Sequence, residues 1–339
     1  MPLENYGVLK GRPITSRLGA GRSPHYQVHI VDDTTDYRIA VNVRSRLFPS
    51  ELLYLVDERF DHPLLDELVE FPQGFTELDR RPGGVALDYI RGNLLSREAM
   101  TPLAHDIPGP DNDLNEKIDR IIQRALADEE AMVYAFGERW GPEPDKRDKH
   151  FGFLPGNGIH DIHMNQGNHE DFKRDDGVWQ DGGLLIHFPV EQRWVGIFLA
   201  FQSQAWHTDD VTGHAIASPG ETPGGDGTQT ADGRVRIVAA LVNPAGHDVG
   251  LETVTLVNTT PGPIDLDGWA IADRNNKREV LQGPVLEPGQ ALTMTLSGAG
   301  AQLSNRGGTI TLLDPADLKV DGVAYTRTAA RRQGWTLVF

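Results

Sequence analysis

Residues 25–43 read HYQVHIVDDTTDYRIAVNV. Two runs in this stretch, HYQVHIV and YRIAVNV, alternate apolar and polar residues, and DDTTD between them has the composition of a turn. Alternation is typical of a β-strand, because successive side chains point to opposite faces. The stretch therefore predicts a β-hairpin or two neighbouring strands, with His25, Gln27 and His29 together on one side.

The rest of the N-terminal part mixes helix and strand signals. Residues 111–130, DNDLNEKIDRIIQRALADEE, carry apolar residues at steps of three and four, which predicts an amphipathic helix. Runs of strand length follow, namely MVYAFGERW, GGLLIHF and WVGIFLAFQS. Because strands with at least one long helix between them are typical of α/β and α+β domains, we expect one of these classes for the N-terminal domain.

The chain of 339 residues is long enough for two domains that each bury a core. Residues 217–232 are rich in Gly, Pro, Thr and Asp and have the composition of a flexible linker, so we expect domains at residues 1–216 and 233–339. The second segment contains six short apolar runs separated by turn residues. This pattern predicts an all-β sandwich.

The formal net charge is −17, and residues 233–339 hold ten basic and ten acidic residues, so the whole imbalance lies in the preceding part. A field of that sign repels a polyanion at long range, which makes nucleic acid a poor substrate or partner.

The absence of cysteine excludes disulfides, thiolate metal sites and a cysteine nucleophile. We find no run of eighteen apolar residues and no secretory signal, so we expect no membrane span and a cytoplasmic location.

Two resemblances extend these expectations. The C-terminal part resembles a lamin-tail domain in the segments ETVTLVN, LDGW and LSNRGG, at Glu252–Asn258, Leu266–Trp269 and Leu303–Gly308. This resemblance implies an immunoglobulin-like fold over residues 233–339 and a module that binds or positions a protein partner. Residues 1–215 resemble the YukJ-like proteins, a bacterial family of unassigned function, in YGVLKG, YRIAVNVRS, GIHDIHMNQGN, WQDGGLLIHF and FLAFQSQAWHTDD.

Histidines and side-chain amides are concentrated in residues 158–171, which read GIHDIHMNQGNHED. The glycines do not suit a helix interior, so we expect an extended segment in which side chains alternate. Asp161, His163 and Asn165 then share one side, and we expect this side to be presented. We expect His160 on the opposite side, facing the core with the apolar residues of the segment.

Two histidines are each followed, two residues later, by an amide: His25 by Gln27 and His163 by Asn165. This arrangement resembles the phospholipase D-like phosphodiesterases, in which one histidine attacks phosphorus and another protonates the leaving group. The resemblance implies a phospholipase D-like fold and a small or lipid-like phosphodiester substrate. The predicted catalytic residues are His25, Gln27, Asn42, His163, Asn165 and Asn168. In the family a lysine stands at the positions of the two amides, so here the positive charge would come from Lys10, Arg38, Arg44 or Arg91.

Two other interpretations of the same residues stay open. His160, Asp161, His163 and His169 are candidate ligands for a divalent metal, because imidazole and carboxylate ligands suit zinc, iron or manganese in a metal-dependent hydrolase. Alternatively, the segment is a polar network that ties loops together, and the protein is a non-catalytic binding protein whose lamin-tail module docks a partner. No Walker loop, dinucleotide-binding glycine motif or Gly-x-Ser-x-Gly elbow is present.

Overall fold

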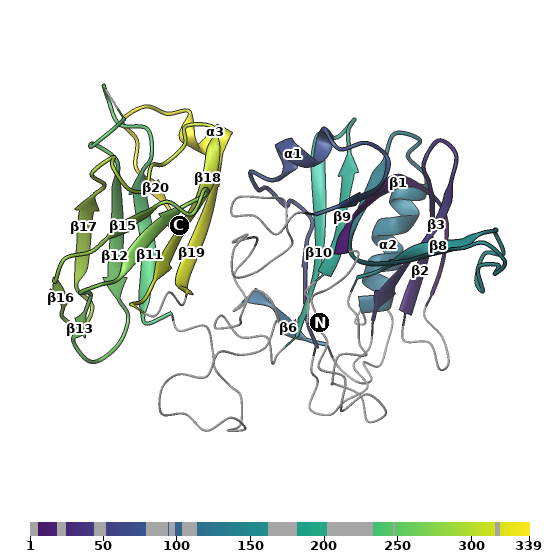
Figure 1. Cartoon of the computed structure of the whole chain (residues 1–339), viewed down its shortest axis with the longest axis horizontal. Helices are drawn as coiled ribbons and strands as arrows, with labels where there is room; N and C mark the ends of the chain where they lie inside the picture. The colour runs from purple at the N-terminus through teal and green to yellow at the C-terminus, as the bar shows by residue number, and fades with distance from the viewer. Residues whose placement is uncertain are drawn as a thin grey trace.

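The N-terminal part of the computed structural model is built around one large, curved β-sheet (Figure 1). The structure describes residues 6–18, 25–43, 52–78, 94, 99–103, 114–161, 182–201, 233–246, 248–315 and 319–339. The described strands of this part are β1 (Tyr6–Arg17), β2 (His25–Val31), β3 (Asp36–Asn42), β4 (Leu52–Asp57), β5 (Gly74–Glu77), β6 (Thr101–Pro102), β7 (Met132–Glu143), β8 (Gly156–His160), β9 (Gly182–Phe188) and β10 (Arg193–Phe201). Its described helices are α1 (Leu65–Val69) and α2 (Leu114–Leu126).

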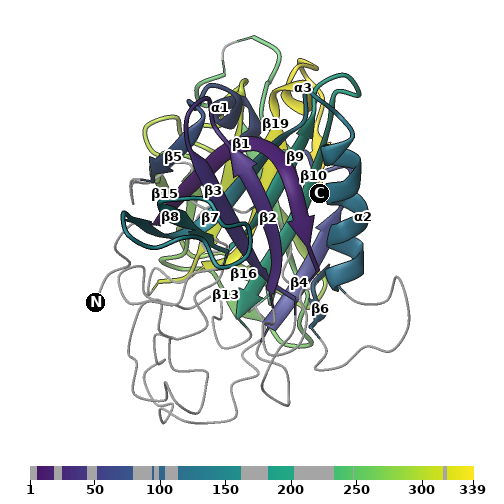
Figure 2. The same cartoon turned by 90° about the vertical axis from the view of Figure 1, so that its right-hand side faces the viewer.

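The sheet closes on itself into a barrel. Its strand order is β5-β1-β2-β3-β8-β7-β9-β10-β4-β6, and β1 pairs with β7 as well. The length of β1 allows this, because Tyr6–Gly11 pair with β7 and Arg12–Arg17 pair with β2. Strands β1, β2, β3, β8 and β7 therefore form a closed ring, and Figure 2 looks onto the first three of them. Among the described strands, β3 and β8 are parallel and the other pairs are antiparallel.

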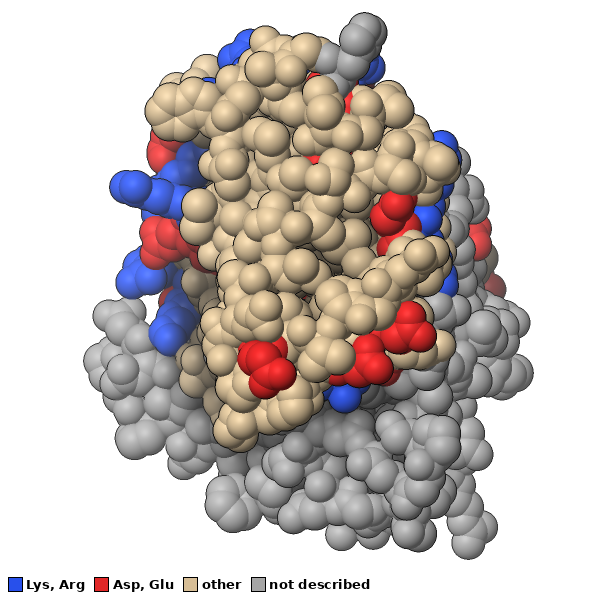
Figure 3. All heavy atoms as spheres, turned by 90° about the vertical axis from the view of Figure 1, so that its left-hand side faces the viewer, with Lys and Arg blue, Asp and Glu red and all other residues tan. Residues whose placement is uncertain are grey.

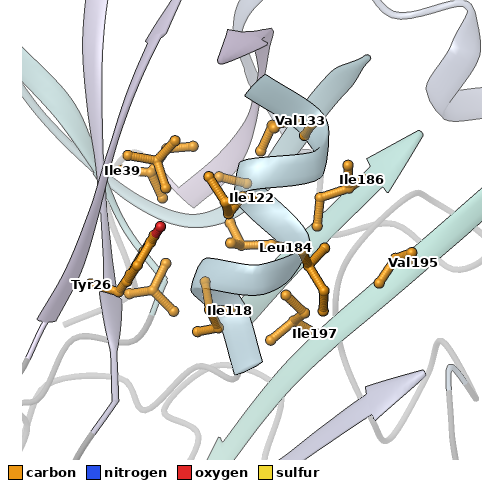
Figure 4. Close-up of a cluster of buried hydrophobic side chains, with 14 of the residues drawn as sticks. Tyr26, Ile39, Ile118, Ile122, Val133, Leu184, Ile186, Val195 and Ile197 are labelled. Atoms are coloured by element: carbon orange, nitrogen blue, oxygen red, sulfur yellow. The ribbon is translucent and has the colours of Figure 1, made fainter. Parts of the chain in front are cut away.

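Helix α2 fills the concave side of this sheet. Figure 4 shows Ile118 and Ile122 of α2 among the side chains of Tyr26, Ile39, Val133, Leu184, Ile186, Val195 and Ile197. All of these side chains are fully buried, and each contributes about 1.5–3 kcal/mol through removal of apolar surface from water. The hydroxyl of Tyr26 donates to Asp119 of α2 at 2.6 Å, so β2 and the helix are joined by a polar contact as well.

A second core covers the opposite face of β9 and β10. Leu185 and Phe198 of these strands pack with Leu65 and Leu68 of α1 and with Phe60. Both strands are therefore buried on both faces, which explains why they read as nearly continuous apolar runs. Within the described residues, no helix is both long and apolar enough to cross a membrane.

The predicted α/β or α+β class of the N-terminal domain is wrong, and so is the predicted phospholipase D-like fold. This part is mostly β, and α2 packs inside the curved sheet instead of forming the crossover between successive parallel strands. The individual elements are confirmed, since the predicted helix lies at Leu114–Leu126 and the predicted hairpin is β2 and β3. A helical period shows that a helix forms, but strand pairing decides the fold class.

The C-terminal part is all-β, as predicted. Its described elements are β11 (Val235–Leu241), β12 (Thr253–Asn258), β13 (Ile264–Asp265), β14 (Ala270–Asp273), β15 (Arg278–Val280), β16 (Val285–Leu286), β17 (Ala291–Thr295), β18 (Gly307–Leu313), β19 (Lys319–Thr326), α3 (Arg327–Ala330) and β20 (Leu337–Val338). The sheets β17-β12-β11-β20 and β15-β14-β18-β19 enclose a core around Trp269, and β13 pairs with β16. The side of the molecule that this part forms is dominated by uncharged residues (Figure 3).

The two parts have separate cores, and an ion pair joins described residues of both. Arg274, in the turn between β14 and β15, forms an ion pair of 2.9 Å with Glu67 of α1. The predicted linker at residues 217–232 lies outside the described residues, and independent folding of residues 1–216 and 233–339 stays a prediction.

Candidate functional site

Several polar side chains meet at one end of the barrel. β2 begins at His25, β3 ends at Asn42, and these two residues lie opposite each other in the antiparallel register. β8 ends at His160, which lies beside Ala40 of β3 in the parallel register. The hairpin and the parallel strand thus bring residues 25, 42 and 160 together, although they are far apart in the sequence.

The two histidines are in ring contact. The ring centroids of His25 and His160 are 5.2 Å apart, and the rings are inclined at 72°. The indole of Trp140, from β7, also contacts His160, with the ring centroids 4.9 Å apart. Both histidines are partly exposed. The arrangement therefore offers two adjacent imidazoles beside an aromatic wall.

Gly158 allows the tryptophan to reach this position. A Cβ atom at residue 158 would overlap the indole ring of Trp140 and the carbonyl oxygen of Arg38. Trp140 lies opposite Gly158 in the register of β7 and β8. Its ring therefore lies over β8 at the position where glycine has no side chain. Any larger residue at 158 would displace the aromatic wall.

Arg38, Asp148 and Gln27 form a buried polar network next to Trp140. The guanidinium of Arg38 lies over the Trp140 ring at 4.5 Å, and its Nε donates to Asp148 at 2.5 Å while Nη1 donates to Gln27 at 2.7 Å. Burial alone would raise the pKa of the Asp148 carboxyl, but hydrogen bonds from Arg38 and from the backbone of Phe151 and His150 hold it below its usual value. Arg38 is thus already compensated by a carboxylate.

Asp161 holds the end of β3 in place. It is 1% exposed. Its carboxylate accepts a hydrogen bond of 3.1 Å from the backbone N–H of Asn42 and one of 3.4 Å from the side-chain amide of Asn42. Its own backbone N–H donates to the carbonyl of Ala40 at 3.2 Å. The role of Asp161 in this geometry is to fix Asn42 beside His25.

The predicted orientation of the 158–171 segment is wrong where the structure describes it. Asp161, expected on the presented side, is buried, and His160, expected to face the core, lies partly exposed against His25. The residue of β8 that enters the core is Ile159, which is fully buried among the apolar side chains inside the barrel. For the described residues 160 and 161, the burial is therefore the reverse of the prediction.

The structure brings some of the predicted site residues together, and others lie outside the described residues. His25, Asn42, His160 and Asp161 gather at the barrel end, and Gln27 lies next to them with its side chain bound to Arg38. The other predicted site residues, His163, Asn165, Asn168 and His169, lie outside the described residues. Within the described ranges, no three His, Asp or Glu side chains are placed to hold a metal ion, and the metal interpretation stays a prediction.

Sequence reasoning missed Trp140 and Asp148. Trp140 stands in a run that was interpreted as a core strand, and Asp148 stands in the segment between β7 and β8 without a motif. Neither gives a local signal of its place beside residues 27, 38 and 160, because the contacts depend on which strands pair.

Comparison with known proteins assigns each of the two parts to a family. The chain belongs to the DUF2278 family, described as an uncharacterized conserved protein, whose profile matches residues 1–213. A lamin tail domain matches residues 228–327. The chain is similar to the uncharacterized protein YukJ of Bacillus subtilis (strain 168), with 47% identity over 214 residues, which are 62% of this chain and 93% of YukJ. The YukJ-like and lamin-tail resemblances are therefore confirmed, whereas these matches give no support to the phospholipase D-like resemblance.

Proposed function

We propose that the barrel is a hydrolase in which His25 and His160 serve as general acid and general base on a phosphodiester of a small or lipid-like molecule. The observation that carries this proposal is the ring contact between the two histidines at 5.2 Å, at the end of the strands that present them. Histidine is the side chain whose ordinary pKa lies nearest to neutral pH, so two adjacent imidazoles suit the paired proton transfers of ester hydrolysis.

The geometry favours acid–base catalysis over a phosphohistidine. Rings that touch at 5.2 Å leave no room for a phosphorus atom between them, so a substrate would lie across both ring edges. One imidazole would take a proton from water as the water oxygen bonds to phosphorus. The other, protonated, would donate its proton to the ester oxygen as the P–O bond breaks, and proton exchange with solvent would restore both rings.

The charge of the site sets a limit on the substrate. Arg38 is a described cation close to the histidines, since its guanidinium lies 4.5 Å from the centroid of the Trp140 ring, which in turn contacts His160. Asp148 compensates that cation, and the chain as a whole carries −17. A phosphodiester, with one negative charge, suits this environment better than a doubly charged phosphomonoester.

The test is hydrolysis of bis(4-nitrophenyl) phosphate, thymidine 5′-(4-nitrophenyl) phosphate and glycerophosphocholine, with and without divalent metal. His25→Gln and His160→Gln should each slow turnover by roughly 10²–10⁴-fold. His29→Gln is the matched control, because His29 lies on the same face of β2 but is stacked on Phe151 and Phe153. Wild-type inactivity towards all three esters, or full activity of both variants, would contradict the proposal. Activity that appears only with added metal would favour the metal-dependent alternative.

A separate observation favours a docking role for the lamin-tail part. The side chains that β12 and β17 turn outward are uncharged, namely Thr253, Thr255, Val257, Ala291, Thr293 and Thr295. In a chain with a net charge of −17, an uncharged face adds no electrostatic repulsion against a second copy of the chain, so the first partner to test is a second copy. Sedimentation velocity of the whole chain should show a dimer that Thr255→Glu with Thr293→Glu abolishes, whereas a monomer at all concentrations would exclude self-association through this face.

A further inference from the structure

A pocket lies at the end of the barrel opposite the paired histidines. It has a volume of about 340 Å³ and is lined by residues from the β2–β3 turn and from the ends of β7 and β8, namely Thr34, Thr35, Asp36, Tyr37, Arg139, Pro142, Leu154, Pro155 and Asn157. His25 and Asp36 stand at the two ends of the hairpin, and the seven residues of β2 from 25 to 31 span about 20 Å. The pocket is therefore distinct from the paired histidines.

Arg139 is the cation of this pocket. Its guanidinium lies over the ring of Phe75 at 5.1 Å, and Nη2 makes a long hydrogen bond of 3.5 Å to the amide oxygen of Asn157. Its Nε is buried and has no hydrogen-bond partner among the described residues. A guanidinium carries five N–H donors in a planar fork, so Arg139 keeps unused donors in a fixed orientation at the pocket wall.

The acidic groups near the pocket are occupied elsewhere. The carboxylate of Asp36 lies 2.7 Å from Nε2 of His29. The carboxylate of Asp32 accepts hydrogen bonds from the hydroxyl of Tyr37 at 2.9 Å and from the backbone N–H groups of Thr34 and Thr35 at 2.7 Å each. No described carboxylate forms an ion pair with Arg139, so the guanidinium is available to an anion.

We propose that this pocket binds a small monocarboxylate with an apolar body, whose carboxylate pairs with the guanidinium of Arg139. The planar fork of arginine matches a carboxylate in two parallel hydrogen bonds. The walls formed by Pro142, Leu154 and Pro155 supply apolar contact for the rest of the ligand. The volume equals that of roughly ten water molecules in the liquid, which suits a molecule of the size of benzoate. One arginine beside one aspartate favours a single negative charge, so inorganic phosphate should bind less well.

The test uses the whole chain and benzoate, with benzamide and inorganic phosphate as comparison probes at equal ionic strength. Benzoate at 20 mM should raise the melting temperature by a few degrees above the value in chloride, and it should move the Arg139 Nε–Hε signal in a ¹H–¹⁵N NMR spectrum. Both effects should disappear in Arg139→Gln. They should persist in Arg120→Gln, which removes a charge from the exposed face of α2, and in His25→Gln, which changes the other end of the barrel.

A second variant covers the case in which Arg139→Gln does not fold. Leu154 is 50% exposed, so Leu154→Glu adds a negative charge to the pocket wall without disturbing the core, and it should abolish benzoate binding. The proposal is overturned if benzoate has no effect beyond that of chloride, if phosphate or benzamide acts as strongly as benzoate, or if Leu154→Glu still binds benzoate. Because the paired histidines play no part in this assay, its outcome is independent of the proposed hydrolase activity.

Discussion

Glu252 should make the stability of the lamin-tail part fall as the pH rises towards neutrality. The side chain is 2% exposed, and its carboxylate accepts a hydrogen bond of 2.9 Å from the backbone N–H of Leu303. Burial raises its pKa from 4.5 to about 7; the Leu303 hydrogen bond opposes the rise, and the nearby carboxylates of Asp248 and Asp273 add to it. The folded protein thus keeps a proton on Glu252 at pH values at which the unfolded chain has lost it.

The sign and the size of the effect follow from this difference in pKa. Between pH 4.5 and pH 7 the native state binds more protons than the unfolded state, so the free energy of unfolding falls as the pH rises. The contribution of Glu252 is fully present below the unfolded pKa and is lost by the folded pKa of about 7. Its upper bound is roughly 3 kcal/mol, because each pKa unit corresponds to about 1.4 kcal/mol.

Glu252→Gln removes this titration while leaving an amide oxygen that accepts from Leu303. Relative to the wild type, the variant should therefore gain up to roughly 3 kcal/mol between pH 5 and pH 8. For a domain of this size that is a relative rise in melting temperature of about 10 °C or more, measured by calorimetry of the whole chain at both pH values. Glu287→Gln is the control, because Glu287 is exposed in the turn before β17. If Glu252→Gln and the wild type show the same pH dependence, the carboxyl is ionised in the native state and the reasoning fails.

Three further predictions concern the barrel and its contact with the C-terminal part. Gly158→Ala should lower the free energy of unfolding by about 1–3 kcal/mol, because its Cβ would overlap a carbonyl oxygen and an indole ring; an unchanged urea midpoint would contradict this. Arg38→Met should cost about 3–5 kcal/mol by leaving the Asp148 carboxylate buried without its partner, and Arg38→Met with Asp148→Leu should recover most of the loss in a double-mutant cycle. Arg274→Ala should change stability by less than about 1 kcal/mol, since this arginine and Glu67 are both about one-third exposed, and a large loss in calorimetry would show that the contact matters more than its geometry implies.

The elements of the fold were predictable wherever one face of an element is buried. The alternation of residues 25–43 predicts the hairpin, and the same alternation correctly groups His25 with Gln27 on the face opposite Tyr26. The three- and four-residue period of residues 111–130 predicts α2, whose apolar side fills the sheet. Local patterns succeed in such cases because the chain must turn its apolar side chains to the same side.

The fold class and the site depend on contacts between distant segments. An apolar strand carries no mark of its partner, so nothing in the sequence of β1 shows that its first half pairs with β7 and closes the barrel. For the same reason the contact between His25 and His160, and the burial of Asp161 against Asn42, appear only when β8 joins β3.

The sequence by itself located the β2–β3 hairpin, helix α2, the strands β7, β9 and β10 and the two families along the chain, because periodicity, turn composition and family motifs are local properties. It did not locate α1 or the strands β1, β4, β5 and β6. The tertiary structure alone decided that the N-terminal part is a barrel and not an α/β sheet, and that the ring of His160 lies against that of His25. The physical reason is that β-pairing energy comes from backbone hydrogen bonds, which are alike for all strands. Register and partner are therefore chosen by the packing of the whole core.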